Sequence, residues 1–293
     1  MPGRGARRAL VISTFYSNEI LVIMAAALMI TGGVAGLLAG LLGVGGGIVI
    51  VPVLFILFTY MQVPAEIIMH MAVATSLLTI IPISLSSTRA HHRRGAVDFG
   101  VLKSWGPFIL LGAAIGGGLS GHIDAQYLQL LFGVVALWVA ITMIRKKQDG
   151  GAPHPHNAAQ ADTTKDGAVN PLKPLGQGLT GRAISAAIGL ASALMGIGGG
   201  TIAVPVMAGL SMPMHRAVGT AAAFGILVAV PGVVGFWWAG VGVDLRPPFS
   251  LGFVSAPAAI IISLTSMFTV PLGSRIAHAL DPVLLRRVFG FFL

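Results

Sequence analysis

Long apolar runs, separated by short polar or basic turns, make up most of this chain. They cover residues 20–42, 70–88, 101–119 and 127–144 in the first half, and residues 215–238 and 250–270 in the second. A helical run of about 18 residues or more can cross the ~30 Å hydrocarbon layer of a membrane. The shorter apolar segment at residues 48–60 suits a half-helix or re-entrant segment. Further short apolar segments lie at residues 183–195, 201–210 and 283–293. The pattern predicts an all-α, polytopic membrane protein with about eight to ten membrane segments.

Two glycine-rich stretches interrupt the apolar pattern. The first is Gly43-Val44-Gly45-Gly46-Gly47 followed by Pro52, and the second is Gly196-Ile197-Gly198-Gly199-Gly200 followed by Pro205, 153 residues later (198 − 45 = 153). Each glycine costs a helix roughly 1 kcal/mol relative to alanine, so each stretch predicts a break inside a membrane-embedded helix. A helix that restarts after a break presents unpaired N–H groups and the positive end of its dipole. The two breaks therefore predict an anion site inside the membrane.

The chain repeats itself beyond these glycines. The segment from His70 to Thr75 (HMAVAT) corresponds to the segment from His215 to Thr220 (HRAVGT), and the Val-Asp pair at Asp98 corresponds to that at Asp244. We therefore predict two homologous membrane repeats with glycine-broken helices, residues 20–147 and 180–293. A basic N-terminal lead of residues 1–19 precedes them, and a polar flexible linker of residues 148–179 joins them.

Positive charge indicates the orientation of the repeats. Basic clusters at residues 89–94 and 145–147 lie two spans apart, which places both of them, and the linker, on the cytoplasmic side. In the second half Arg275, Arg286 and Arg287 place residues 272–287 on that side as well. The corresponding turn of the first half, residues 118–124, has no Lys or Arg and is expected outside. We therefore favour inverted repeats over parallel ones, although the arginines of the N-terminal lead argue the other way.

Composition agrees with a membrane protein. The chain of 293 residues is 55% hydrophobic and 9% charged, whereas a soluble domain has about 25% charged residues. We assign the net charge of +9 to cytoplasmic loops that face anionic lipid, and expect no nucleic-acid partner. Because the chain has no cysteine, disulfides and thiolate metal sites are excluded. His154 and His156 in the linker do not predict a metal site, and no cofactor or metal is expected.

The positions of the acidic residues favour an anionic substrate. None of the nine falls in the middle of a predicted span: Glu19, Glu66, Asp98, Asp124, Asp149, Asp162, Asp166, Asp244 and Asp281. A cation site or a carboxylate proton relay at the membrane centre would need such a residue. An anion site can instead use the backbone N–H groups of glycines, which allow close approach. The predicted donors are Gly45, Gly46, Gly47, Gly198, Gly199 and Gly200, with mere helix packing as the alternative role.

Side chains near the starts of the helices that follow the breaks are further candidates. The hydroxyls of Thr75, Ser76 and Thr220 could donate to oxyanion oxygens, or could bond only to their own helices. Arg216 could contact an oxyanion in bidentate fashion or extend to lipid headgroups. His70 and His215 are proton-coupling candidates because histidine titrates near neutral pH, although loop-facing histidines without such a role are common.

The doubled motif Gly-x-Gly-Gly-Gly-x4-Pro, each copy followed by Ala-Val-(Ala/Gly)-Thr, resembles the TauE/SafE family of sulfite and organosulfonate exporters, the TSUP transporters. The resemblance covers about residues 20–144 and 180–293. It implies a multi-pass transporter of the bacterial inner membrane that carries a small anion, with sulfite or organosulfonates as substrates. The linker is longer than the family pattern leads us to expect.

The sequence motifs give little support for an enzyme. The first glycine stretch has part of a dinucleotide fingerprint, but no βαβ unit surrounds it and no lysine follows it as in a phosphate-binding loop. We therefore predict a transporter, not an enzyme, that works by alternating access around the two breaks. The alternatives are a passive anion channel, a permease for small carboxylates and a membrane scaffold. The sequence leaves open whether the chain forms homo-oligomers.

Overall fold

The structure is a computed structural model that describes residues 18–145, 178–243 and 246–280. The elements described in the first half are α2 (Asn18–Leu42), α3 (Gly47–Tyr60), α4 (Ala65–His92), α5 (Phe99–Leu119), the 3-10 turn η1 (Ser120–His122) and α6 (Ala125–Arg145). Those of the second half are α7 (Gly178–Met195), α8 (Gly200–Gly209), α9 (Met214–Ala239), β1 (Ser250–Leu251), β2 (Val254–Ser255) and α10 (Ala256–Ala279).

The predicted all-α, polytopic fold is confirmed. Six of the described helices, namely α2, α4, α5, α7, α9 and α10, are long and apolar enough to cross a membrane. Helices α3 and α8 are shorter, and each follows one of the glycine breaks. The only sheet in the described part is the antiparallel pairing of β1 with β2, which has two residues per strand.

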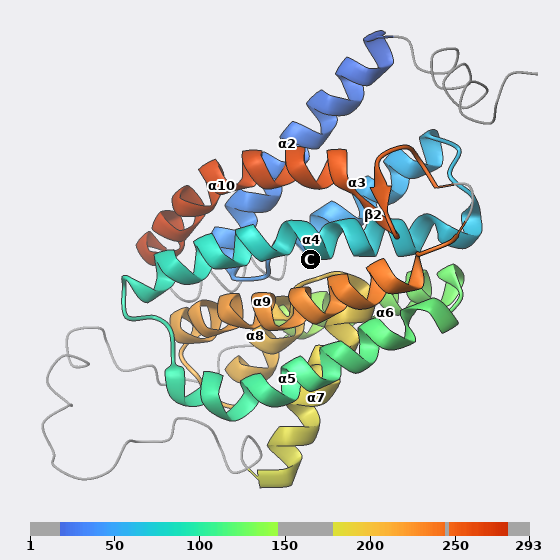
Figure 1. The fold of residues 1–293 in the computed structure, drawn as a ribbon. Helices are drawn as coiled ribbons and strands as arrows, with labels where there is room; N and C mark the ends of the chain where they lie inside the picture. Colours follow the sequence, from blue (N-terminus) through green and yellow to red (C-terminus); the bar gives the residue numbers. More distant parts are fainter. Residues whose placement is uncertain (1–17, 146–177, 244–245, 281–293) are drawn as a thin grey trace, which may run out of the picture.

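Helices α4 and α9 form the centre of the bundle and lie side by side, with α10 and α2 on one side of them and α5 and α7 on the other (Figure 1). The burial of the spans reflects this order. In the most apolar window of each helix, 83% of α4 and 67% of α9 is buried, against 28% of α2 and 33% of α10. Large apolar side chains such as Ile23, Leu111 and Phe268 are exposed on the outer helices. A surface of this kind is suited to contact with lipid.

Small residues let the outer helices approach closely. A Cβ atom added to Gly36 would lie 2.5 Å from the carbonyl oxygen of Ser266, and one added to Gly40 would overlap the carbonyl oxygen of Val270, both on α10. Gly36 and Gly40, which are spaced as a GxxxG pair, therefore serve close helix packing. Gly112 of α5 and Gly189 of α7 make the equivalent close contact between those helices.

Several boundaries differ from the sequence predictions. Helix α4 begins at Ala65, directly after Pro64, so His70 lies inside the helix and not at its start. The segment expected as a span from residue 250 starts with the β1–β2 hairpin, and its helix begins only at Ala256. Helix α7 includes residues 178 and 179, which were assigned to the linker. The rest of the linker, the lead of residues 1–17 and the expected segment at residues 283–293 lie outside the described residues.

The packing agrees with an inverted arrangement of the halves, which remains a prediction. His70 near the start of α4 lies 6.2 Å from Phe236 near the end of α9, measured between ring centroids. At the other end of α4, Nδ1 of His91 lies near His278, whose ring stacks on that of His215 at the start of α9. The two corresponding helices are therefore antiparallel. Helix α2 packs on α10 as α7 packs on α5, so corresponding helices exchange partners between the halves.

Candidate anion-binding site

Each glycine stretch forms a short non-helical turn between two helices. Helix α2 ends at Leu42 and α3 begins at Gly47, while α7 ends at Met195 and α8 begins at Gly200. Three glycines of each turn have left-handed backbone: Gly43, Gly45 and Gly46 with φ of 67°, 73° and 76°, and Gly196, Gly198 and Gly199 with φ of 69°, 65° and 71°. Side chains rarely tolerate this conformation, so glycine is needed at the same three positions of both turns.

The two turns are in direct contact with each other. A Cβ atom on Gly47 would overlap the carbonyl oxygen of Gly196 and lie 2.8 Å from Cα of Ile197. Conversely, a Cβ atom on Gly200 would overlap the carbonyl oxygen of Gly43 and lie 2.7 Å from Cα of Val44. The contact is reciprocal, because each residue of one pair corresponds to a residue of the other. All ten residues of the two turns are buried.

Each turn also packs on the Ala-Val motif of the opposite half. A Cβ atom on Gly43 would overlap the carbonyl oxygen of Val218 in α9, and one on Gly196 would lie 3.0 Å from Cα of Val73 in α4. Ser76 strengthens the second of these contacts, since its hydroxyl donates to the carbonyl oxygen of Gly196 at 2.8 Å. The predicted glycines and Ser76 are therefore brought together in one place.

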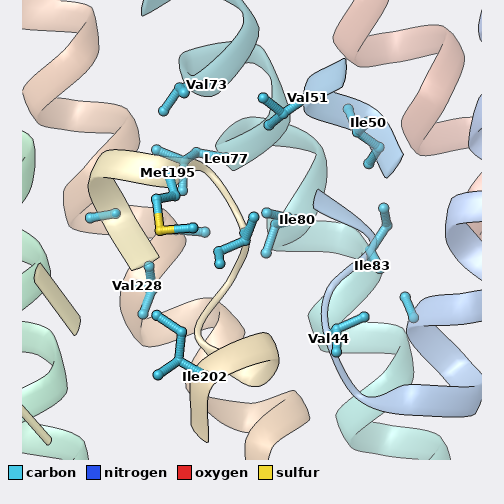
Figure 2. Packing of buried hydrophobic residues seen from close by; sticks show 14 of the residues in the cluster. Val44, Ile50, Val51, Val73, Leu77, Ile80, Ile83, Met195, Ile202 and Val228 are labelled. Atoms are coloured by element: carbon cyan, nitrogen blue, oxygen red, sulfur yellow. The ribbon is translucent and has the colours of Figure 1, made fainter. Parts of the chain in front are cut away.

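Two residues of α4 that the sequence reasoning did not select lie between the turns. Cγ2 of Ile80 is 3.3 Å from the Cβ position of Gly45 and 3.0 Å from that of Gly198, so one methyl group touches both turns. Figure 2 shows Ile80 between the chain around Val44 and the segment from Met195 to Ile202. One helical turn further on, Oγ of Ser84 lies 3.5 Å from the Cβ position of Gly45 and packs against Gly225 of α9. Ser84 could have been noticed only as a hydroxyl within an apolar run.

Polar groups without partners gather around this contact. Five buried hydroxyls of the described residues have no hydrogen-bond partner, and three of them, those of Ser84, Ser192 and Thr201, belong to residues that contact or flank the turns; the others are those of Thr88 and Ser250. Ser192 lies in the last turn of α7 and Thr201 in the first turn of α8, on either side of the second break. In the same part of the chain, no backbone acceptor pairs with the N–H groups of Gly45, Gly46, Gly198 and Gly199. Buried donors are nearly always satisfied by protein, water or a ligand, so this set leaves hydrogen-bonding capacity for a guest.

Thr75 and Thr220 use their hydroxyls at two helix starts. Oγ1 of Thr75 accepts from the backbone N–H of Ser255, the N-cap of α10, and Oγ1 of Thr220 accepts from that of Asp98, the N-cap of α5, each at 2.9 Å. Both hydroxyls are fully buried and each keeps its own hydrogen to donate. The structure therefore places them at corresponding junctions between the two halves.

Arg216 forms an ion pair. Its Nη2 lies 3.1 Å from Oδ2 of Asp98, and its side chain is 48% exposed. The other oxygen of Asp98 accepts from the N–H groups of Gly100 and Val101 and so caps α5. The predicted anion contact at Arg216 would therefore share the guanidinium with this carboxylate.

The two predicted proton-coupling histidines have different surroundings. Nε2 of His70 lies 3.1 Å from the carbonyl oxygen of Ser120 and 2.9 Å from that of Ile123, and its Nδ1 is buried without a partner. The ring of His215 stacks on that of His278 at 5.6 Å between centroids. His70 thus contacts the segment after α5, and His215 contacts the end of α10.

A cavity of about 500 Å³ lies away from the turns, between the end of α5 with η1 and the last turns of α9. His122 and Trp238 are in its wall. It contains none of the predicted site residues. The glycine contact is chemically the better candidate, because the unpaired donors gather there and not around the cavity.

None of the described acidic residues is in contact with the glycine turns. In the described ranges they are Glu19 in the first turn of α2, Glu66 in the first turn of α4, Asp98 at the N-cap of α5 and Asp124 just before α6. The other five lie outside the described residues. No described carboxylate therefore opposes an anion at the glycine turns.

Comparison with known proteins gives a consistent result. The family profile "Sulfite exporter TauE/SafE" matches residues 28–293. A protein of Haemophilus influenzae is 31% identical over 90% of this chain and 93% of its own length, and one of Methanocaldococcus jannaschii is 26% identical over 91% of each. A Bacillus subtilis protein is 34% identical over 61% of this chain and 66% of its own. All three are named "Probable membrane transporter protein". No solved structure matches this chain. The chain belongs to the TauE/SafE family of membrane transporters.

Proposed function

We propose that this protein transports a small sulfur oxyanion, sulfite or an organosulfonate, across the bacterial inner membrane by alternating access around the two glycine turns. The linker of residues 148–179 would then face the cytoplasm. The observation that most supports the proposal is the reciprocal contact of Gly47 with Gly196 and of Gly200 with Gly43. It brings two helix starts to one buried point.

The chemistry of that point suits an anion. Unpaired N–H groups of Gly45, Gly46, Gly198 and Gly199 are the donors that an oxyanion accepts from, and the dipoles of α3 and α8 add positive potential. The hydroxyl of Ser84 adds a side-chain donor without a partner. A sulfite or sulfonate group has three oxygens and can accept from several of these donors together.

Transport through this point requires movement. The turns are buried, and Ile80 fills the space between them, so an anion can enter only when the two halves separate. Because each half supplies one turn and packs on the other, a rocking motion of the halves would open the site to one side at a time. A continuously open channel is less compatible with this closed contact.

The test is a transport assay with the full chain in liposomes. We expect uptake of sulfite and sulfoacetate against a gradient when an ion or voltage gradient is imposed, with acetate and malonate as weaker competitors. A passive channel would give only downhill flux, and a carboxylate permease would reverse the order of competition. Preference for cations or neutral solutes would contradict the proposal, and folded protein without any flux would favour the scaffold alternative.

A further inference from the structure

Three histidines from three helices meet where α4 and α10 end and α9 begins. Nδ1 of His91 lies 3.1 Å from Nε2 of His278, with 5.2 Å between the ring centroids. The ring of His215 stacks on the ring of His278, with 5.6 Å between the centroids and 15° between the planes. His91 is only 1% exposed, while His278 and His215 are partly exposed. The cluster is therefore buried at one end and reachable at the other.

The hydrogen bonds fix where the protons lie. Nε2 of His91 is 2.9 Å from the carbonyl oxygen of Gly40, and a carbonyl can only accept, so Nε2 carries the hydrogen. In the neutral ring Nδ1 of His91 is then an acceptor, and Nε2–H of His278 must donate to it. Nδ1 of His278 is the position where the pair can take one further proton without losing either hydrogen bond. A second added proton would set two N–H groups against each other.

The charged groups around the pair limit it to that single proton. Arg94, which follows α4, holds its guanidinium against the carbonyl oxygen and the hydroxyl of Ser274 on α10. The titratable groups that face the pair are therefore Arg94, His215 on α9, and the two rings themselves. No described carboxylate is within ion-pairing distance of them. No group of three or more His, Asp or Glu in the described part is placed to hold a metal ion.

The pair is tied to the first glycine turn. Gly40, which accepts from His91, is three residues before Gly43 in the last turns of α2. Ser87, one helical turn before His91, donates to the adjacent carbonyl of Ala39 at 3.2 Å. The end of α2 that leads into the turn is thus held by α4 through two hydrogen bonds, one of which comes from a member of the histidine pair.

We propose that His91 and His278 form the proton-binding site of this transporter, so that one proton crosses in the same direction with each anion that the glycine turns carry. The inference rests on the proposed function and assigns its coupling ion. A proton that crosses together with the anion offsets one of its negative charges and so reduces the charge that moves through the membrane potential. Protonation alters the His91–His278 bond, and through Gly40 it reaches the helix that enters the first turn.

The experiment compares the full-length wild type with H278Q and H91Q in liposomes, with labelled sulfoacetate as the probe. Sulfoacetate keeps its charge between about pH 6 and 8, so its own titration does not contribute. Anion uptake and internal pH, reported by a trapped dye, are recorded together while potassium and valinomycin clamp the voltage. Glutamine places an N–H where Nε2 of histidine lies but does not titrate. The hydrogen bond of residue 278 to His91, and that of residue 91 to Gly40, can therefore persist.

For the wild type we expect proton movement that is coupled to anion uptake and a clear pH dependence of the uptake rate. H278Q and H91Q should lose the coupled proton movement and flatten the pH profile while still binding sulfoacetate. H92Q is the matched control, because His92 is exposed and its ring contacts Phe99. This variant should behave like the wild type. If a glutamine variant does not fold, H91F replaces it. The corresponding position in the second half, Phe236 (236 − 91 = 145), already has a phenyl ring.

Two results overturn the inference. One is wild-type transport of sulfoacetate without proton movement, and the other is unchanged proton movement and pH profile in folded H278Q and H91Q. If the wild type carries none of the sulfur oxyanions tested, the proposed function itself fails, which is a different outcome from transport without protons.

Discussion

Gly47 and Gly196 touch through their backbones, with the carbonyl oxygen of Gly196 in the place that a Cβ atom of residue 47 would occupy. Gly200 and Gly43 make the mirrored contact. No side chain can lie between the two turns at these points. This closeness allows donors from both halves to reach one guest.

Gly47→Ala should destabilise the protein. The added methyl group must displace backbone of the second turn and not merely a flexible side chain, and overpacking of this kind costs about 1–3 kcal/mol. The effect should appear as a lower midpoint of thermal unfolding in detergent. Gly33→Ala is the matched control in α2, because nothing lies within 4 Å of its Cβ position. It should leave the midpoint unchanged or raise it, and equal effects of both variants would speak against the tight contact.

Ser84→Ala should weaken anion binding without weakening the fold. The hydroxyl has no partner in the protein, so its loss breaks no internal hydrogen bond. A hydrogen bond to a charged guest contributes about 1.5–3 kcal/mol, which corresponds to roughly a tenfold or larger rise in the apparent Kd for sulfite. Competition binding on the purified protein measures this. Ser104→Ala, whose hydroxyl donates only to Val101 of its own helix, serves as the control and should not change the Kd.

Ile80→Val should change which anions are accepted. Cγ2 of Ile80 contacts both turns, and removal of one methylene beside it typically costs 0.5–1.5 kcal/mol. The extra room should favour larger sulfonates over sulfite in the ratio of their transport rates. Ile109→Val, which shortens an equally buried side chain on α5, should leave that ratio as it is. A uniform loss of rate for all anions would mean that Ile80 only supports packing.

Thr220→Val should cost stability at the start of α5. Valine has nearly the same shape but cannot accept from the N–H of Asp98, and an unsatisfied buried donor costs about 1–3 kcal/mol. Thr75→Val should have the same effect at the start of α10, through Ser255. Thr59→Val is the control, since that hydroxyl is exposed and bonds to its own helix. The midpoints of thermal unfolding of the three variants measure this: those of Thr220→Val and Thr75→Val should fall, and that of Thr59→Val should not.

Much of the fold could be predicted from the sequence, because a helix that crosses a membrane needs a long uninterrupted run of apolar residues. Runs that the structure forms into α2, α5 and α9 were placed to within a few residues. The start of α4 was missed because the helix was expected to begin at His70. Pro64 is its N-cap, and the helix begins at Ala65, more than one turn before His70. The β1–β2 hairpin was also missed, since its strands have only two residues each and lie in an apolar run.

The candidate site was only partly predictable. The glycines stand out in the sequence by their repetition, but their mutual contact depends on how α2 and α7 meet. Ile80 and Ser84 give no local signal, because an isoleucine and a serine in an apolar helix are ordinary. The pairing of His91 with His278 joins residues 187 positions apart, and the basic cluster at the end of α4 was interpreted as an orientation signal.

The most direct measurement is the position of a heavy-atom analogue of the substrate. Crystals grown with selenite in place of sulfite would give an anomalous difference map in which selenium is identified without ambiguity. We expect the peak between the two turns, within hydrogen-bonding distance of the N–H groups of Gly45, Gly46, Gly198 and Gly199 and of the hydroxyl of Ser84. A peak only in the cavity beside His122 and Trp238, or none at a selenite concentration that inhibits transport, would contradict the account.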